Sequence, residues 1–259
     1  MNSGHGDHRP ESELVVIRRI TDFSFLTALV ASTAAQEVRV SEEPLRASIS
    51  RSLLLGDSIT DITCWRPLVW DQITAAGLAG SVDFVGTMNI LQAKCSRPPD
   101  FDPNHEDHSG WQAYDIAKKN IVGCVQNTKP DIVQFMLDTN DVNIGKRDVE
   151  SIIGSYTTML DAMHVANPRV KVIVDKLIPT SWSDPTIEAL NNAIPGWVQQ
   201  RTTGESPVVI ADCSRAAGFT NAMLQDDGVH PNSQGDQFLA GRIGPKLIQL
   251  INNVRVSTK

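Results

Sequence analysis

The chain has 259 residues, of which 41% are hydrophobic, and its 30 acidic and 23 basic side chains give a net charge of −7. This composition is typical of a globular protein that is long enough to form one sizeable core. The acidic balance and the lack of a Lys/Arg cluster argue against nucleic acid as a partner, because binding a row of phosphates requires basic side chains. No apolar run reaches the roughly 18 residues of a membrane span, so no membrane partner is expected.

Residues 1–48 are interpreted as an N-terminal extension. Within them, residues 23–35 form the longest apolar run, which follows Arg18-Arg19 and ends in small side chains, the outline of a secretory signal. The alternative is an irregular, partly buried segment. We expect the folded domain to span residues 49–253, residues 254–259 to be a C-terminal tail, and the protein to be secreted and extracellular.

The four cysteines are Cys64, Cys95, Cys124 and Cys213. None of them forms a C-x-x-C pair, so neither a zinc site nor a thioredoxin-type motif is predicted. An even number in a secreted chain allows two disulfides, with three possible connectivities. The alternative is four buried thiols.

Strand-like and helix-like patterns alternate from residue 50 onward. The strand at 131–137 is largely apolar, as expected for a strand buried on both faces. Five strands alternating with five helices predict a single doubly wound α/β domain with a mostly parallel five-stranded sheet. The predicted strands are 52–55, 82–86, 131–137, 170–174 and 207–211, and the predicted helices are 65–76, 110–126, 149–163, 187–199 and 233–251, the last with a kink at Pro245.

Polar residues interrupt this pattern after three of the strands. They are Gly56-Asp57-Ser58, the segment 138–141, and the loop 227–230. Because the carboxyl ends of parallel strands meet at one edge of the sheet, we expect these segments to share one crevice. The alternative for Gly-Asp-Ser is turn chemistry alone.

The loop near the C-terminus suggests a particular chemistry. Asp227 and His230 are three residues apart, so the carboxylate can accept a hydrogen bond from the imidazole Nδ1 and fix its tautomer. The imidazole Nε2 is then free to take the proton of Ser58, as nucleophilic acyl transfer requires. The alternative for His230 is a surface side chain in a turn.

These residues resemble a known family. Gly56-Asp57-Ser58, Gly110, Asn140 and Asp227-x-x-His230 look, in order, like the four blocks of the SGNH (GDSL-type) esterases and lipases, over about residues 53–250. Closer still, Cys64-Trp65-Arg66, His108-Ser109-Gly110-Trp111 and the segment 227–232 are similar to carbohydrate esterase family three, the acetyl xylan esterases of plant-cell-wall degraders. The resemblance implies a flavodoxin-like three-layer α/β/α fold.

The same resemblance implies roles for individual residues. Ser58 is the nucleophile, His230 the general base and Asp227 its orienting carboxylate. The oxyanion hole consists of the backbone N–H groups of Ser58 and Gly110 and the side-chain amide of Asn140. Four further residues are assigned to substrate binding: Asp57, Trp65, Arg66, and Trp182, which lies in a loop after a strand.

Two segments depart from this picture or compete with it. The third block of the family usually begins with Gly, whereas this chain has Asp138, whose carboxylate could oppose the charge of an oxyanion, point away or bind a cation. Residues 105–108, His-Glu-Asp-His, could form a metal cluster, but we interpret them as a loop of solvated polar residues. No metal and no cofactor are therefore expected.

The leading hypothesis is a monomeric serine esterase that removes O-acetyl groups from xylan or a related acetylated polysaccharide through an acyl-enzyme intermediate. A second hypothesis is a GDSL-type esterase or lipase that acts on other acyl esters. A third, from another class, is an inactive carbohydrate-binding protein, motivated by Asp138.

Overall fold

The structure is a computed structural model that describes residues 49–90, 95–182 and 185–257. The predicted N-terminal extension 1–48, with its signal-like run, lies outside the described residues. The described residues belong to one compact unit, built on a parallel β-sheet.

Five parallel strands form the core of the sheet in the order β2-β1-β4-β5-β6, which confirms the predicted doubly wound fold. They are β1 (Ser50–Gly56), β2 (Val82–Val85), β4 (Ile132–Met136), β5 (Lys171–Lys176) and β6 (Val208–Asp212). Every residue of β4 is buried, as its largely apolar sequence predicts. A short additional strand, β3 (Glu106–Asp107), pairs with Leu55 and Gly56 of β1 beyond the end of β2.

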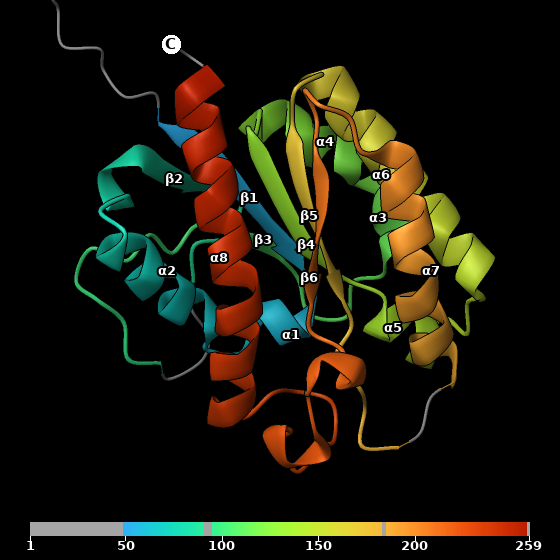
Figure 1. The fold of residues 1–259 in the computed structure, drawn as a ribbon. Coiled ribbons are helices and arrows are strands. Elements are labelled where there is room, and N and C mark those ends of the chain that lie inside the picture. Colours follow the sequence, from blue (N-terminus) through green and yellow to red (C-terminus); the bar gives the residue numbers. More distant parts are fainter. Residues whose placement is uncertain (1–48, 91–94, 183–184, 258–259) are drawn as a thin grey trace, which may run out of the picture. The chain divides into compact units, whose positions relative to one another are not determined.

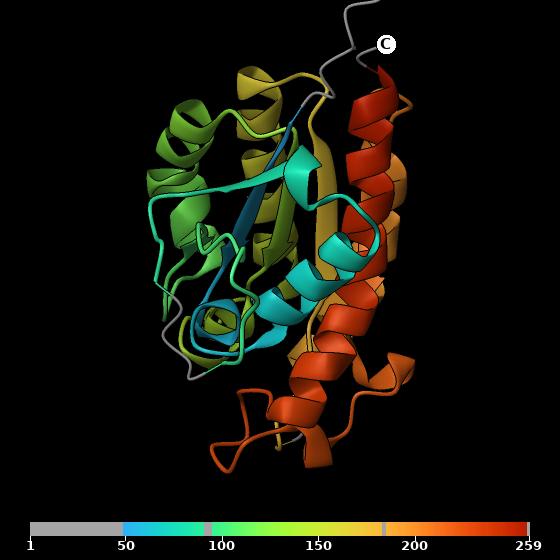
Figure 2. The ribbon, with the colours of Figure 1, turned by 90° about the vertical axis from the view of Figure 1, so that its left-hand side faces the viewer.

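Helices cover both faces of this sheet and complete a three-layer α/β/α arrangement (Figures 1 and 2). On one face, α2 (Trp65–Ala75) packs against α8 (Ser233–Ser257). On the other face lie α3 (Ala113–Lys119), α4 (Ile121–Thr128), α6 (Val149–Ala166) and α7 (Pro185–Arg201). The remaining elements are short: α1 (Ser58–Asp61), α5 (Thr139–Asn143), and the 3₁₀ turns η1 (Ala79–Ser81), η2 (Arg215–Ala217) and η3 (Asn221–Met223).

Two helices differ from the sequence prediction. The helix expected over 110–126 starts only at Ala113 and is divided at Asn120, a weak helix former. The helix α8 runs without interruption through Pro245 to Ser257, and Val254 is buried, so residues 254–257 are helical rather than part of a tail. Gly244 allows α2 to approach closely, since a Cβ there would lie 2.1 Å from Oε1 of Gln72.

One disulfide joins Cys64 to Cys95, with a Cα–Cα distance of 5.5 Å, while Cys124 and Cys213 are buried free thiols. This arrangement falls between the two alternatives of two disulfides and four thiols. The bond ties the start of α2 to the segment that follows β2. Over the described ranges, no helix combines the length and apolar character needed to cross a bilayer.

The disulfide predicts a measurable loss of stability on its removal. Its partners are 31 residues apart in sequence, and a loop of this size corresponds to about 3–4 kcal/mol in the chain-entropy model. We expect the Cys64→Ser/Cys95→Ser variant to lose about that much free energy of unfolding in urea titrations, and Cys124→Ser to retain the disulfide. A loss below about 1 kcal/mol would show that the bond does not restrict the unfolded chain.

Candidate active site

Ser58 lies at the carboxyl edge of the sheet, two residues after the end of the interior strand β1. Asp57 caps the short helix α1, because its Oδ1 accepts a hydrogen bond from the backbone N–H of Ile59 at 2.9 Å. Gly56 is required just before it, since a Cβ there would lie 2.4 Å from Oγ1 of Thr60 and 2.8 Å from Oδ1 of Asp107. The tight strand-to-helix junction holds the Ser58 hydroxyl at the tip of the strand.

The structure brings Ser58, His230 and Asp227 into one hydrogen-bonded row. His230 Nε2 lies 2.8 Å from Ser58 Oγ, and His230 Nδ1 lies 2.6 Å from Asp227 Oδ2. With Nδ1 donating to the carboxylate, Nε2 is the acceptor for the Ser58 hydroxyl. The arrangement can therefore move a proton from the hydroxyl to the imidazole.

The turn 227–230 is held by hydrogen bonds within itself. Asp227 Oδ1 accepts the backbone N–H groups of Val229 at 2.9 Å and His230 at 3.0 Å. Partial burial acts to raise the pKa of Asp227, but the hydrogen bonds from the His230 and Val229 backbone and from the imidazole outweigh it and lower the pKa below its ordinary value. Asp227 is thus kept as a carboxylate that can stabilise an imidazolium.

Asn140 lies at the start of α5, close to Asp57. Its side-chain amide donates to Asp57 Oδ2 and to the backbone carbonyl of Trp111, both at 3.1 Å. These two bonds fix the orientation of the amide. Since both N–H groups are engaged, donation to an oxyanion requires one of them to be shared with or released by its present acceptor.

Gly110 lies in the loop between β3 and α3, with a left-handed backbone at φ +86 that favours glycine. Three contacts bring this loop to the site. The N–H of His108 donates to the carbonyl of Gly56 at 3.1 Å, the hydroxyl of Ser109 donates to Asp61 Oδ2 at 2.9 Å, and the carbonyl of Trp111 accepts from Asn140. These hydrogen bonds fix the loop, and with it Gly110, against β1, α1 and α5.

Asp57 was predicted to bind substrate, yet it is only 1% exposed. Burial raises the pKa of Asp57 to about 7. The hydrogen bond from Ile59 acts to lower this pKa, whereas the nearby carboxyl groups of Asp107 and Asp141 act to raise it further. The structure thus gives this side chain contacts to α1 and Asn140 in place of the predicted contact with substrate.

Asp138 points away from the solvent and into the core. Its backbone is left-handed at φ +91, which explains why glycine suits this position. Its side chain is fully buried and accepts a hydrogen bond from the hydroxyl of Tyr156. Burial, and then the carboxyl group of Asp141, raise the pKa of Asp138 well above its ordinary value, so the structure disfavours a negative charge at this position.

Trp65 and Arg66 were predicted to contact substrate, and this prediction is wrong. Both are 0% exposed. Arg66 Nε donates to the carbonyl of Thr60 at 3.2 Å and lies 3.7 Å from Asp107 Oδ2. Arg66 therefore supports α1 from the interior, where burial lowers its pKa against the attraction of Asp107 and Asp61.

The interpretation of residues 105–108 as a solvated loop is also wrong. His105, Glu106 and Asp107 are buried, the last two as strand β3. His105 Nδ1 lies 2.9 Å from Asp107 Oδ2, and His108, which pairs with Glu106 at 2.9 Å, stacks on Trp111 with a centroid distance of 3.7 Å. Within the described part of the chain, no group of three or more His, Cys, Asp or Glu side chains is arranged to hold a metal ion.

Trp182 is the one predicted substrate contact that the structure leaves accessible. Its side chain is 46% exposed at the edge of a cavity beside the turn 227–230. Sequence reasoning missed the supporting residues Asp61, Ser109 and Asp141. Asp141 accepts the N–H groups of Ala113 and Tyr114 at 2.7 and 3.0 Å and so anchors the start of α3. In the sequence, Asp141 is distinguished only as one of the polar residues 138–141 that follow a predicted strand.

Comparison with known proteins agrees with a hydrolase of this fold. The model of the GDSL-like lipase/acylhydrolase family matches residues 54–238. A crystal structure of an acetyl esterase mutant with acetate ion is 79% identical, with 80% of this chain and 100% of that chain covered and a TM-score of 0.79. A carbohydrate esterase family 3 protein from Talaromyces cellulolyticus is 80% identical, with 79% and 99% covered and a TM-score of 0.78.

A family 3 carbohydrate esterase from Clostridium thermocellum has the same fold at 24% identity, with a TM-score of 0.67 over 80% of this chain and 100% of that one. A search of curated proteins finds no match. The chain belongs to the GDSL-like lipase/acylhydrolase family and, within it, to carbohydrate esterase family 3. It is thus a carboxylic ester hydrolase, as its motifs predicted.

The buried acids predict an unusual dependence of stability on pH. A carboxyl group whose pKa is raised in the folded state binds a proton there that the unfolded chain has already lost, so the free energy of unfolding falls as pH rises. For Asp57 the window runs from the ordinary value of 3.8 to about 7. We expect the wild-type Tm to fall as the pH rises from about 5 to about 7, and Asp138→Asn to reduce that slope.

The matched control is Asp161→Asn, on an exposed position of α6. It should follow the wild-type curve. A slope in Asp138→Asn equal to that of the wild type would show that Asp138 is ionised in the folded protein.

Proposed function

We propose that the protein removes O-acetyl groups from acetylated carbohydrates, xylan among them, by acyl transfer through Ser58. The observation that carries the proposal is the 2.8 Å contact between Ser58 Oγ and His230 Nε2, with Asp227 behind the imidazole. The acetyl group is supported by the relative at 79% identity, whose structure is that of an acetyl esterase with acetate ion. The carbohydrate is supported by the family 3 relatives.

In the first half of the reaction, Ser58 Oγ attacks the acetyl carbonyl carbon while His230 Nε2 takes its proton. The negative charge that develops on the carbonyl oxygen is stabilised by the backbone N–H groups of Ser58 and Gly110 and by the Asn140 amide. The tetrahedral intermediate then collapses. Its bond to the sugar oxygen breaks, and that oxygen takes the proton from His230.

In the second half, a water molecule gives a proton to His230 Nε2 and attacks the acetyl-Ser58 ester. Collapse of the second tetrahedral intermediate releases acetic acid and returns the proton to Ser58 Oγ. Asp227 remains a carboxylate throughout and stabilises the imidazolium, a role that suits its lowered pKa. The two halves use the same three side chains and the same oxyanion donors.

The covalent structure supports a place of action outside the cell. The Cys64–Cys95 disulfide supports an oxidising, extracellular environment. A polymeric plant polysaccharide is also a substrate that an enzyme must meet outside the cell. We propose a secreted enzyme that acts as a monomer.

A first experiment tests the nucleophile. Ser58→Ala removes the attacking oxygen while leaving the junction after β1 intact, so it should abolish acetate release from acetylated xylan and from an aryl acetate. Circular dichroism and Tm should match the wild type. Retention of more than a few per cent of the wild-type kcat by a folded variant would contradict the assignment.

A second experiment tests the oxyanion donor. Asn140→Ala should lower kcat by on the order of 10²–10³ with little change in KM, because the amide stabilises the charge of the transition state. Asn143→Ala, at the other end of α5, is the matched control and should keep the wild-type kcat. Equal kcat in both variants would remove Asn140 from the oxyanion hole.

A further inference from the structure

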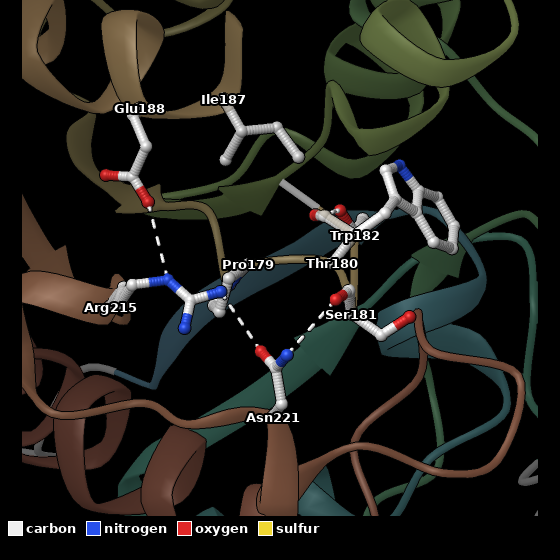
Figure 3. Close-up of a pocket in the computed structure, with 8 residues that line it drawn as sticks. All are labelled: Pro179, Thr180, Ser181, Trp182, Ile187, Glu188, Arg215 and Asn221. Atoms are coloured by element: carbon white, nitrogen blue, oxygen red, sulfur yellow. Dashed lines mark hydrogen bonds and ion pairs between the residues drawn. The ribbon is translucent and has the colours of Figure 1, made fainter. Parts of the chain in front are cut away.

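A cavity of about 240 Å³ lies beside the proposed active site, at the carboxyl end of β5 (Figure 3). Three parts of the chain form it: the loop after β5, the start of α7, and the 3₁₀ turns η2 and η3. Its lining includes Ser181, Trp182, Ile187, Glu188, Arg215 and Asn221. At about 30 Å³ for each water molecule of the liquid, the volume equals that of about eight waters, about the size of a single sugar ring.

Two residues that line the cavity, Ser181 and Trp182, lie against the turn that carries Asp227 and His230. The backbone N–H of Ser181 donates to the carbonyl of Gly228 at 2.8 Å. A Cβ on Gly228 would lie 2.0 Å from Ser181 Oγ and 3.5 Å from the Trp182 ring. The Trp182 indole therefore stands directly against the catalytic turn.

The side chains around the cavity offer two kinds of contact. The exposed indole of Trp182 presents an apolar face, on which the C–H groups of a sugar ring can pack. Polar groups line another part of the cavity: Arg215 donates to Asn221 Oδ1 at 3.0 Å, and Asn221 donates to the carbonyl of Ser181 at 3.1 Å. In the view of Figure 3, Trp182 lies on the side opposite Glu188 and Arg215.

The charges in the cavity favour a neutral ligand. Arg215 Nε lies 3.8 Å from Glu188 Oε1, and both side chains are about half exposed. The pair brings one positive and one negative charge, so it offers donors and acceptors without net charge. An apolar platform with a few oriented polar groups suits a neutral pyranose better than a fatty acyl chain or an anion.

The chemistry of the leaving group places the sugar on this side of the site. The acetyl carbonyl must point its oxygen towards Asn140 and Gly110, whereas the sugar oxygen must receive its proton from His230 Nε2. The sugar therefore lies beside His230. Ser181 and Trp182, which line the cavity, lie against Gly228 in the same turn as His230, so the cavity is placed to take a neighbouring ring of an oligosaccharide.

We propose that this cavity is a subsite for a neutral sugar ring of the polysaccharide that carries the acetyl group, with Trp182 as its stacking platform. The inference rests on the proposed function, since it assigns the alcohol side of the same ester. It predicts that Trp182 acts on the recognition of oligosaccharides and that a substrate without a sugar does not use the cavity.

The test compares two substrates in three variants. The substrates are an acetylated xylooligosaccharide and an aryl acetate, and the variants are Trp182→Ala, Trp182→Phe and Val165→Ala. Val165, an exposed side chain on α6, is the control. We expect Trp182→Ala to lower kcat/KM relative to the wild type at least tenfold more for the oligosaccharide than for the aryl acetate. The loss on the oligosaccharide should come mainly from a higher KM. Trp182→Phe should recover most of the loss, and Val165→Ala should match the wild type on both substrates.

A binding measurement separates the two proposals. Ser58→Ala and Ser58→Ala/Trp182→Ala are titrated calorimetrically with the same acetylated xylooligosaccharide, and the second should bind at least tenfold more weakly. If binding depends on Trp182 but the wild type releases no acetate from the oligosaccharide, the proposed function is overturned and the subsite is supported. Equal losses on both substrates, or binding unaffected by Trp182, would overturn the subsite.

Discussion

The contact between Ser58 and His230 is the interaction on which the rest of the site depends. The two residues are 172 positions apart, and only the parallel sheet brings them together, because it ends β1 and the strands that precede the last loop at one edge. Each partner is fixed locally by a carboxylate on a neighbouring residue. Asp57 caps α1 beneath Ser58, and Asp227 closes the turn that holds His230.

Behind this contact lies a group of buried acids that orders the oxyanion side of the site. Asp57 holds the Asn140 amide, Asp141 anchors the start of α3, and Asp138 pairs with Tyr156 in the core. Burial raises the pKa of all three. Each of these groups is costly to ionise, so the buried acids on this side of the site make the fold more stable at mildly acidic than at neutral pH.

The sequence predicted much of the fold and of the site, for physical reasons that particular residues illustrate. Apolar runs such as Leu53-Leu54-Leu55 are buried and became strands, and the polar residues that end them meet at one edge. The exposure of individual side chains could not be predicted as well from the sequence. Trp65 and Arg66 follow the Ser58 motif closely, yet the direction of α2 turns both into the core, and an arginine is rarely buried without a partner such as Asp107.

The pairing of Cys64 with Cys95 could not be predicted either, because it depends on the path of the long segment after β2. The interior position of β3 had the same cause, since its two residues pair with β1 only after that segment has returned to the sheet.

The activity proposed for this site depends on the activation of the Ser58 hydroxyl by His230. The most direct measurement is labelling with a fluorophosphonate, which reacts only with an activated serine, followed by mass spectrometry of the digested protein. The account predicts one label per chain, on Ser58, and a rate of labelling that collapses in His230→Ala while the fold persists. A label on any other residue, or equal rates in the two proteins, would contradict it.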